Sequence, residues 1–295
     1  MLAKIASSPP APRNDTFFWF AVTFFLLFLP GCATLASSFD PQFTADQIAG
    51  KNRFHKEIIP TQIFTLTTYS RLETPGKPLT VYIEGDGRAW LSKNLLSKDP
   101  TPFHPMVLEL AALDPSPNVV YLARPCQYDN LAFQKPCGPE YWSDKRFSEE
   151  VISSMNEAVD FFAEKAAASQ VHLVGYSGGA AVAVLITERR QDIVSLRTVA
   201  GNLDPEALNR HHRVSPLSGS LDPIQAAPKI SSIPQRHFIG ANDKVVPPSV
   251  SENFLRASED SACVKVTTVE GAGHHSGWAE KWKELIGMPC HCEET

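Results

Sequence analysis

Residues 171–187 read VHLVGYSGGAAVAVLIT, and this stretch decides the fold. Its first residues are mostly β-branched or apolar, which is typical of a buried strand, whereas the alanines and valines after residue 179 are typical of a buried helix. Gly175 and Gly179 flank the connection between the two. Because glycine has no Cβ, the backbone can turn sharply there without a clash. The stretch therefore predicts a strand, a tight turn and a helix, with Ser177 raised above the sheet at the turn.

Residues 175–179 have the form G-x-S-x-G, in which a serine at a strand-to-helix turn serves as a nucleophile. By composition alone, about one random chain in ten of this length would contain the form. Its position between a predicted strand and a predicted helix makes it more specific. The alternative interpretation is a glycine-serine turn that only joins the strand to the helix.

From about Ile58 onward, short β-branched runs alternate with longer amphipathic runs. This alternation predicts an α/β fold, with a mostly parallel central sheet and helices on both faces. We expect parallel strands at Leu79–Glu84, Asn118–Ala123, Val171–Gly175, Ile193–Val199, Arg236–Ile239 and Cys263–Val269, and an earlier antiparallel strand at Ile63–Tyr69. We expect helices at Met106–Leu113, Phe147–Ala168, Gly179–Arg190 and Trp278–Ile286. Residues 58–295 are therefore predicted to form one domain, and the long connection at about 201–235 a short lid insertion.

Two loops elsewhere in the chain carry the partners that a serine nucleophile needs, a base and a group that orients the base. Asp243 lies in GANDKVVP at residues 240–247, just past one predicted strand, and His274 lies in GAGH at residues 271–274, just past the next. In a parallel sheet both loops emerge at the same edge as Ser177. We therefore expect the three side chains to meet there.

These motifs resemble those of the α/β-hydrolase superfamily over about residues 60–287, including the chain order serine, aspartate, histidine. The resemblance implies an α/β-hydrolase fold and a serine hydrolase that cleaves carboxylic esters through an acyl-enzyme. Ser177 would be the nucleophile, His274 the general base and then acid, and Asp243 the group that stabilises the imidazolium. A peptidase or an acyltransferase would use the same residues. The alternative of another class is a non-catalytic lipoprotein that uses this fold as a binding module.

An acyl-enzyme mechanism also needs hydrogen-bond donors for the oxyanion. The backbone N–H of Gly178 is one candidate, and the resemblance places the second in the loop after Leu79–Glu84. Asp86 is the preferred second donor, with Gly87 and Arg88 as alternatives. The carboxylates of Glu84 and Asp86 would oppose an anion there unless Arg88 or Arg124 neutralises them.

Further polar residues near these motifs have other interpretations. Asp204 could replace Asp243 as the acid, although Asp204 before Pro205 is more typical of a helix N-cap. His275 is expected at the rim of the site. His211 and His212 lie in the predicted lid, where exposure to solvent is expected more than substrate contact.

The amino end predicts export. Phe17–Leu29 contains one polar residue in 13 and is too short to span a bilayer, which takes about 20 residues. It follows basic residues and precedes LPGC at 29–32, which resembles a lipobox, so residues 1–31 are predicted to be a lipoprotein-type signal peptide. Lipidated Cys32 would then hold the protein on a membrane surface of the bacterial cell envelope, facing the periplasm. Residues 32–57 would form a tether and N-terminal extension.

The remaining cysteines suit an oxidising compartment. Cys126 is expected to pair with Cys137, and Cys263 with Cys290 or Cys292, which leaves one thiol free. A metal site at residues 290–292 is disfavoured, because the three potential ligands are crowded and no second cluster has a matching spacing.

Composition narrows the function further. With 43% apolar and 20% charged residues, the 295-residue chain can bury a full core, and its net charge of −5 provides no basic face for nucleic acid. No motif implies a cofactor or a metal. The expected partners are a small ester or acyl substrate and the membrane surface at Cys32.

Overall fold

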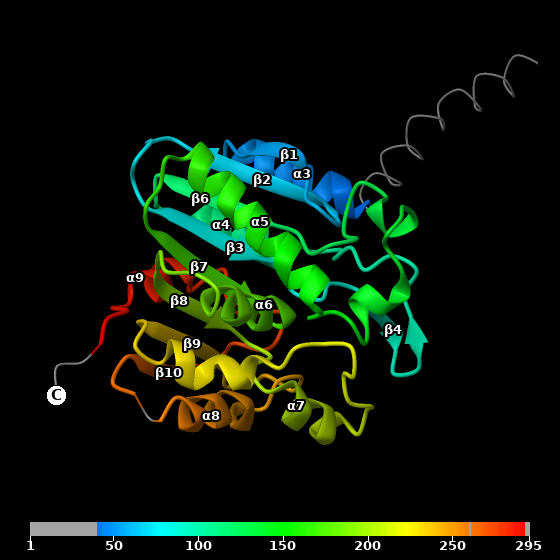
Figure 1. Cartoon of the computed structure of the whole chain (residues 1–295), viewed down its shortest axis with the longest axis vertical. Helices are drawn as coiled ribbons and strands as arrows, with labels where there is room; N and C mark the ends of the chain where they lie inside the picture. The colour runs from blue at the N-terminus through cyan, green and yellow to red at the C-terminus, as the bar shows by residue number, and fades with distance from the viewer. Residues whose placement is uncertain (1–39, 260, 293–295) are drawn as a thin grey trace, which may run out of the picture. The chain divides into compact units, whose positions relative to one another are not determined.

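A computed structural model describes residues 40–259 and 261–292. Its centre is an eight-stranded sheet in the order β1-β2-β6-β3-β7-β8-β9-β10 (Figure 1). The strands are β1 (His55–Pro60), β2 (Thr65–Leu72), β3 (Leu79–Ile83), β6 (Asn118–Leu122), β7 (Val171–Tyr176), β8 (Ile193–Val199), β9 (Gln235–Gly240) and β10 (Val264–Val269). The pairs from β6 to β10 are parallel, whereas β2 runs antiparallel to both β1 and β6. The predicted α/β fold is confirmed, including the early antiparallel strand.

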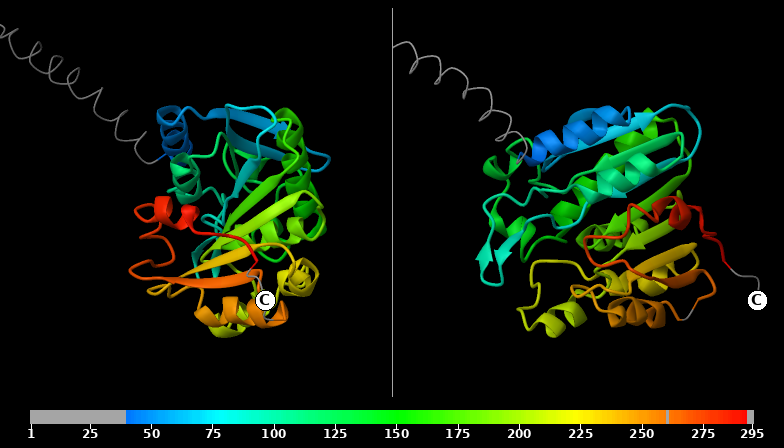
Figure 2. Two further views of the ribbon diagram at one scale, coloured as in Figure 1. Left: turned by 90° about the vertical axis from the view of Figure 1, so that its left-hand side faces the viewer. Right: turned by 180° about the vertical axis from the view of Figure 1, so that it is seen from behind.

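The inner strands β2, β3, β6, β7 and β8 divide their side chains between two buried cores, because successive side chains point to opposite faces. In β6, Val120 and Leu122 enter one core, and Val119 and Tyr121 enter the other. The first core is covered by α5 (Glu149–Lys165), α6 (Gly178–Thr187) and α8 (Pro248–Ala257). The second is covered by α3 (Pro41–Lys51), α4 (Met106–Leu113) and α9 (Trp282–Gly287), so helices lie on both faces (Figure 2).

Helix α6 is buried along its whole length. It contacts β3, β7 and β8 beneath it, α5 beside it and the 3₁₀ segment η3 (Pro223–Ile230). A helix with no solvent face must be apolar all round, which explains its run of alanine, valine, leucine and isoleucine. Alanines also let it approach the sheet closely, and this positions Ser177 at its amino end.

Several parts of the fold differ from the sequence prediction, among them β1, which begins inside the predicted N-terminal extension and was not predicted as a strand. Residues 41–51 form α3 and not a tether, because Ala45 and Ala49 pack into the second core. The compact unit therefore begins at Pro41 and not near residue 58. The connection between β8 and β9 contains α7 (Pro205–His212), of which only the beginning at Pro205 was expected. It also contains η3, which buries Ala226, Ala227 and Ile230 against the body of the domain. Residues 223–230 are therefore part of the compact domain.

A small hairpin after β3 was also not predicted. It consists of β4 (Trp90–Ser92) and β5 (Leu95–Leu96). Figure 1 shows the hairpin toward the same end of the strands as α7, on the right of the view. Three of its apolar side chains are exposed: Trp90, at 45% exposure, Leu91 and Leu95.

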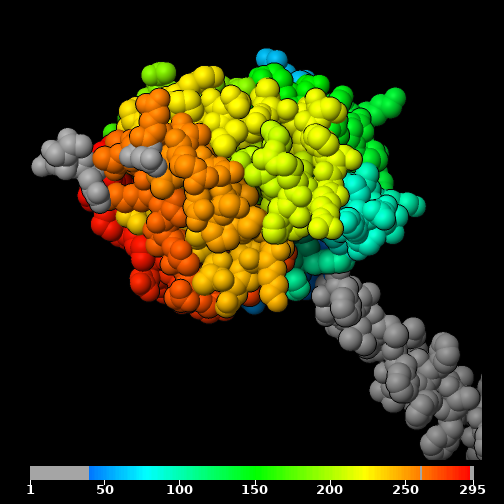
Figure 3. All heavy atoms as spheres, turned by 90° about the horizontal axis from the view of Figure 1, so that it is seen from below, coloured from blue at the N-terminus to red at the C-terminus, as the bar shows by residue number. Residues whose placement is uncertain are grey.

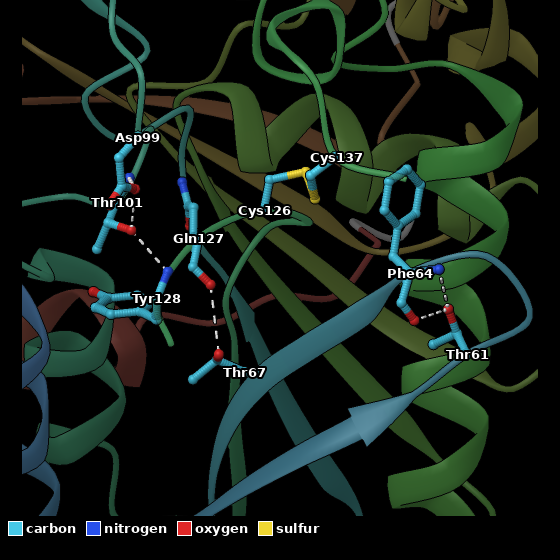
Figure 4. The surroundings of a disulfide bond; sticks show 9 residues. All are labelled: Thr61, Phe64, Thr67, Asp99, Thr101, Cys126, Gln127, Tyr128 and Cys137. Carbon is cyan, nitrogen blue, oxygen red and sulfur yellow. Dashed lines mark hydrogen bonds between the residues drawn. A yellow bond between two sulfur atoms is a disulfide. The ribbon is translucent and has the colours of Figure 1, made fainter. Parts of the chain in front are cut away.

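One disulfide joins Cys126 and Cys137, as predicted (Figure 4). It closes a short loop after β6 that is anchored on two sides: Thr67 of β2 donates to the carbonyl of Gln127, and Tyr128 donates its N–H to Thr101. The Gln127 side chain also donates to the carbonyl of Gly85, in the loop after β3. The disulfide loop therefore braces the loop that begins at Glu84.

The second disulfide joins Cys263 to Cys292, and Cys290 is the free thiol among the cysteines that the structure describes. Of the two partners that the sequence left open for Cys263, the pairing with Cys290 was wrong. Its sulfur lies 3.9 Å from the carbonyl oxygen of Leu196 on β8, whereas Cys292 reaches the start of β10. Burial raises the pKa of the Cys290 thiol, although nearby Arg197 opposes the shift.

Glu84 is a carboxyl group buried in the core at the end of β3. It accepts hydrogen bonds from the N–H of Gly85 (2.8 Å) and the hydroxyl of Tyr121 (3.0 Å). Burial raises the pKa of Glu84 to about 7, even though both hydrogen bonds and Arg124 favour the charged form. The carboxylate is therefore costly to keep ionised inside the protein.

The predicted signal peptide and Cys32 fall in residues 1–39, which the structure does not describe. Among the residues that it does describe, no helix has both the length and the apolarity to cross a membrane.

Replacing Cys126 and Cys137 together by serine should lower the free energy of unfolding by about 3 kcal/mol, because the unfolded chain regains the entropy of the closed loop. Urea denaturation of the oxidised protein measures this. Cys290→Ser is the control, because Cys290 is not bonded, and we expect a change within about 0.5 kcal/mol. A double variant as stable as the wild type would contradict this entropic contribution of the disulfide.

Glu84→Gln should become more stable relative to the wild type as pH rises. The pKa of Glu84 lies above its unfolded value of 4.5, so its contribution to stability is complete below that value and is lost as pH passes about 7. Glutamine carries no charge at any pH. Between pH 5 and pH 8 the difference in unfolding free energy should move in favour of the variant by up to about 3 kcal/mol. A difference that is the same at both pH values in urea denaturation would refute this.

Candidate active site

Ser177 lies at the turn between β7 and α6 with φ 50° and ψ −119°. A positive φ is strained for a residue with a side chain, and the surrounding hydrogen bonds must hold it. Ser177 donates its N–H to Val199 and accepts at its carbonyl from the N–H groups of Ala180 and Asn202. The turn is thereby fixed to β8 and to the loop after it.

The glycines on either side of Ser177 are required by close backbone contacts. A Cβ at Gly175 would lie 2.5 Å from the carbonyl oxygen of Gly179, and one at Gly179 would lie 2.4 Å from that of Glu84. No side chain fits at such distances, because the neighbouring atoms belong to the backbone. The turn can therefore approach β3, and its serine faces the loop that follows β3.

Ser177, His274 and Asp243 form a chain of hydrogen bonds at the carboxyl edge of the sheet. Ser177 Oγ lies 3.1 Å from His274 Nε2, and His274 Nδ1 lies 2.8 Å from Asp243 Oδ2. The three side chains come from the loops after β7, β10 and β9. Because Nδ1 donates to a carboxylate, Nε2 carries the lone pair and can accept the serine proton.

The Asp243 carboxylate is held from its other side. Its Oδ1 accepts the N–H groups of Val245 (2.7 Å) and Val246 (2.9 Å). Burial raises the pKa of Asp243, but the hydrogen bond and charge interaction with His274 and the two N–H groups outweigh it, so the pKa lies below its usual value. Asp243 is therefore ionised at neutral pH and oriented toward the imidazole.

Tyr176 and Trp278 fix the loop that carries His274. Tyr176 donates its hydroxyl to the carbonyl of His274 (3.1 Å), and its oxygen also lies 2.7 Å from Nδ1 of His275. Trp278 donates its indole N–H to the carbonyl of Gly273. His275 is exposed and contacts Tyr176 rather than Ser177. Tyr176 and Trp278 were not identified from the sequence as positioning side chains.

Asp204 lies elsewhere, as the N-cap of α7. Its carboxylate accepts the N–H of Ala207 (2.9 Å) and the side-chain amide of Asn253 (2.6 Å). The interpretation as an N-cap is confirmed. Asp204 shows no contact with His274 and does not take the place of Asp243.

The loop after β3 lies against the amino end of α6. A Cβ at Gly178 would come within 2.0 Å of Asp86 Oδ1, so the two residues touch. Gly85 donates its N–H to the Glu84 carboxylate, and Arg88 donates its N–H to the carbonyl of Pro100. Arg88 is therefore eliminated as an oxyanion donor.

The Asp86 carboxylate has two arginine partners. Arg124 Nη1 lies 3.2 Å from Oδ1, and Arg146 Nε lies 3.5 Å from Oδ2. Arg124 was one of the two neutralising residues expected, whereas Arg146 was not. The guanidinium of Arg88 lies instead over the ring of Phe103. A carboxylate between two guanidinium groups no longer presents a net negative charge to the site.

Ser177 opens onto a cleft of about 1120 Å³. The cleft is bordered by the β4–β5 hairpin, by the segment from α7 to Leu217, and by Val245 and Val246 of the acid loop. Figure 3, which views the protein from below, shows the surface of the hairpin beside that of the segment that contains α7. His212 is part of the wall and lies 2.6 Å from the carbonyl oxygen of Val245, while His211 is not among the lining residues. Within the described chain, no group of three or more histidine, cysteine, aspartate or glutamate side chains is arranged to hold a metal ion.

Solved structures share this fold. The Pyrococcus furiosus esterase Pf2001 aligns with a TM-score of 0.57 at 14% identity, over 81% of this chain and 92% of the esterase. Est1E from Butyrivibrio proteoclasticus aligns with a TM-score of 0.54 at 14% identity, over 78% of this chain and 97% of Est1E. No curated protein matches the sequence significantly.

A family profile described as Serine hydrolase (FSH1) matches residues 127–276, about half of the chain. The matched region begins in the disulfide loop and includes Ser177, Asp243 and His274. The strand-turn-helix, the acid loop and the histidine loop all fall within it. This chain therefore belongs to the serine hydrolase family FSH1.

Proposed function

We propose that this protein hydrolyses carboxylic esters through an acyl-enzyme formed on Ser177. The observation that carries the proposal is the hydrogen-bonded chain from Ser177 through His274 to Asp243, which opens onto the cleft. A serine nucleophile, a base with a free lone pair and an ionised group that orients the base are the parts this reaction needs.

In the first step Nε2 of His274 takes the proton of Ser177 as its oxygen attacks the ester carbonyl. The imidazolium that forms is stabilised by the Asp243 carboxylate and then gives its proton to the departing alcohol. In the second step the same nitrogen activates a water molecule, which attacks the acyl-enzyme and releases the acid. Ser177 recovers its proton from His274, so the enzyme returns to its starting state.

The N–H of Gly178 and the N–H of Asp86 are proposed as the oxyanion donors. Gly178 follows the nucleophile at the first position of α6, where its N–H has no partner within the helix. Asp86 touches Gly178, and its carboxylate is neutralised by Arg124 and Arg146. A donor in this position contributes roughly 3 kcal/mol to the stability of the transition state.

We also propose that the protein is exported and anchored by a lipid at Cys32, in the bacterial cell envelope facing the periplasm. The apolar run at 17–29 and the LPGC sequence at 29–32 support this. The two disulfides support it as well, because such bonds persist mainly in oxidising compartments. Trp90 and Leu91 of the β4–β5 hairpin are exposed at the border of the cleft and suit an aliphatic portion of the substrate.

Substitutions at the three linked residues test the hydrolase proposal. With p-nitrophenyl esters of increasing chain length, Ser177→Ala and His274→Ala should each lower kcat by at least about 10³-fold, and Asp243→Asn by a comparable factor. Asp204→Asn is the matched control, because Asp204 caps a helix away from His274, and its kcat should stay within about threefold of the wild type. Loss of activity in Asp204→Asn with retention in Asp243→Asn would overturn the assignment of the acid.

Lipid attachment is tested by expressing the full chain in a bacterium supplied with labelled palmitate. The wild type should incorporate the label and fractionate with membranes, because an acylated cysteine partitions into the bilayer. Cys32→Ser should lose both properties, while Cys290→Ser, which changes a free thiol of the folded domain, should keep both. A Cys32→Ser protein that still carries the label would rule the anchor out.

A further inference from the structure

Arg146 has an unusual position for an arginine that borders a cleft. It lies just before α5, and its side chain is only 12% exposed. It lines the cleft together with Ser177 and Asp86. Asp86 touches both Gly178 and Arg146, so a single carboxylate separates the guanidinium from the residue that follows the nucleophile.

Arg146 is an ion partner of Asp86 at 3.5 Å, but its guanidinium N–H groups make no hydrogen bond in the described chain. Its Nε is buried and has no hydrogen-bond partner, and none of its nitrogens donates a hydrogen bond within residues 40–259 and 261–292. The Nε of the neighbouring Arg124 is also buried without a partner, but the two terminal nitrogens of Arg124 donate to the Asp86 carboxylate and to the carbonyl of Arg146. A guanidinium group carries five N–H donors, and a buried N–H without an acceptor is energetically costly. Arg146 is therefore prepared for an acceptor that arrives in the cleft.

Asn202 is a second polar group without a partner at the same site. Its N–H donates to the carbonyl of Ser177, which fixes the residue beside the nucleophile. It lines the cleft and is 2% exposed, and its Oδ1 is buried without a hydrogen-bond partner. Buried side-chain amides are normally hydrogen-bonded, and this oxygen is an acceptor, so it indicates a ligand atom that carries a proton, such as a hydroxyl, and not the anion itself.

The charges around the cleft favour an anion. Its lining includes the cations Lys93, Arg146 and Arg213 and the carboxylates Asp86 and Asp144. Asp86 is paired with Arg124, which lies outside the lining, as well as with Arg146, whereas Asp144 keeps its charge and accepts the N–H of Ser218. The cleft is thus positive, although the whole chain has a net charge of −5.

We propose that the cleft selects esters that carry a second, anionic oxygen group, a carboxylate or a phosphate, which Arg146 binds while the ester lies at Ser177. A guanidinium group binds either anion through paired N–H donors, and Asn202 offers its amide to the polar atoms of the same substrate. The inference rests on the proposed ester hydrolysis and specifies its substrate class.

The kinetic test compares monomethyl adipate, which ends in a carboxylate, with the neutral esters methyl hexanoate and dimethyl adipate. Methanol release by the wild type should show a kcat/KM at least about 10-fold higher for the monoester. Arg146→Gln should lower the value for the monoester by about 30-fold more than it lowers the values for the two neutral esters, mainly through KM, because any loss that acts through Asp86 is shared by all three substrates. Arg146→Lys should restore part of the loss because it retains the charge. Equal losses for charged and neutral esters in Arg146→Gln would show a merely structural role and overturn the proposal.

Arg213→Gln is the matched control, because Arg213 is an exposed cation at the rim of the same cleft. Its effect on the monoester should stay within about threefold, since an exposed charge is screened by solvent and salt. A loss as large as that of Arg146→Gln would mean that general attraction, and not recognition by Arg146, selects the anion.

A binding measurement separates this proposal from the hydrolase proposal. In the Ser177→Ala background, calorimetry should show monomethyl adipate binding at least about 10-fold more tightly than methyl hexanoate, and Arg146→Gln should abolish the difference. Adipate and inorganic phosphate, titrated separately, identify which anion is preferred. Selective binding without turnover by the wild type would refute ester hydrolysis but keep the anion site. Turnover without selective binding, and no affinity for either anion, would refute the anion site alone.

Discussion

The close approach of α6 to β3 is the constraint on which the rest of the site depends. At Gly179 the helix comes so near the carbonyl oxygens of Ile83 and Glu84 that no Cβ could be accommodated. This contact places the turn at the edge of the sheet and holds Ser177 at a positive φ, with its side chain toward the cleft. It also brings the loop after β3 against Gly178. The nucleophile and the proposed oxyanion donors are therefore positioned by one backbone contact.

The parallel sheet then accounts for the remaining parts. Because β9 and β10 run in the same direction as β7, the loops that carry Asp243 and His274 end at the same edge. The low pKa of Asp243 and the hydrogen bonds of Tyr176 and Trp278 keep the imidazole oriented without help from a substrate. The binding energy of the substrate is therefore not needed to orient the imidazole. It can serve to select the substrate, which agrees with a cleft lined by Arg146, whose Nε makes no hydrogen bond.

Much of this could be read from the sequence, and what could not has identifiable causes. Strands rich in valine and isoleucine and the motifs at Ser177, Asp243 and His274 are local signals, so the core elements were predicted to within a few residues. Helix α3 was missed because its buried residues are alanines, which give little amphipathic contrast. The choice of Cys292 over Cys290 depends on which sulfur reaches Cys263 in space, and two residues of spacing carry no such information. Arg146 was missed because it precedes a helix with no motif around it, and its role depends on Asp86, which is 60 positions away in sequence.

The central claim is that Ser177 is activated by His274 and faces donors at Gly178 and Asp86. A crystal structure of the protein after reaction with a fluorophosphonate tests this most directly. We expect phosphorus bonded to Ser177 Oγ, with the phosphoryl oxygen within hydrogen-bonding distance of the backbone nitrogens of Gly178 and Asp86 and His274 still paired with Asp243. Phosphorus on another residue, or a phosphoryl oxygen directed away from both nitrogens, would contradict the account.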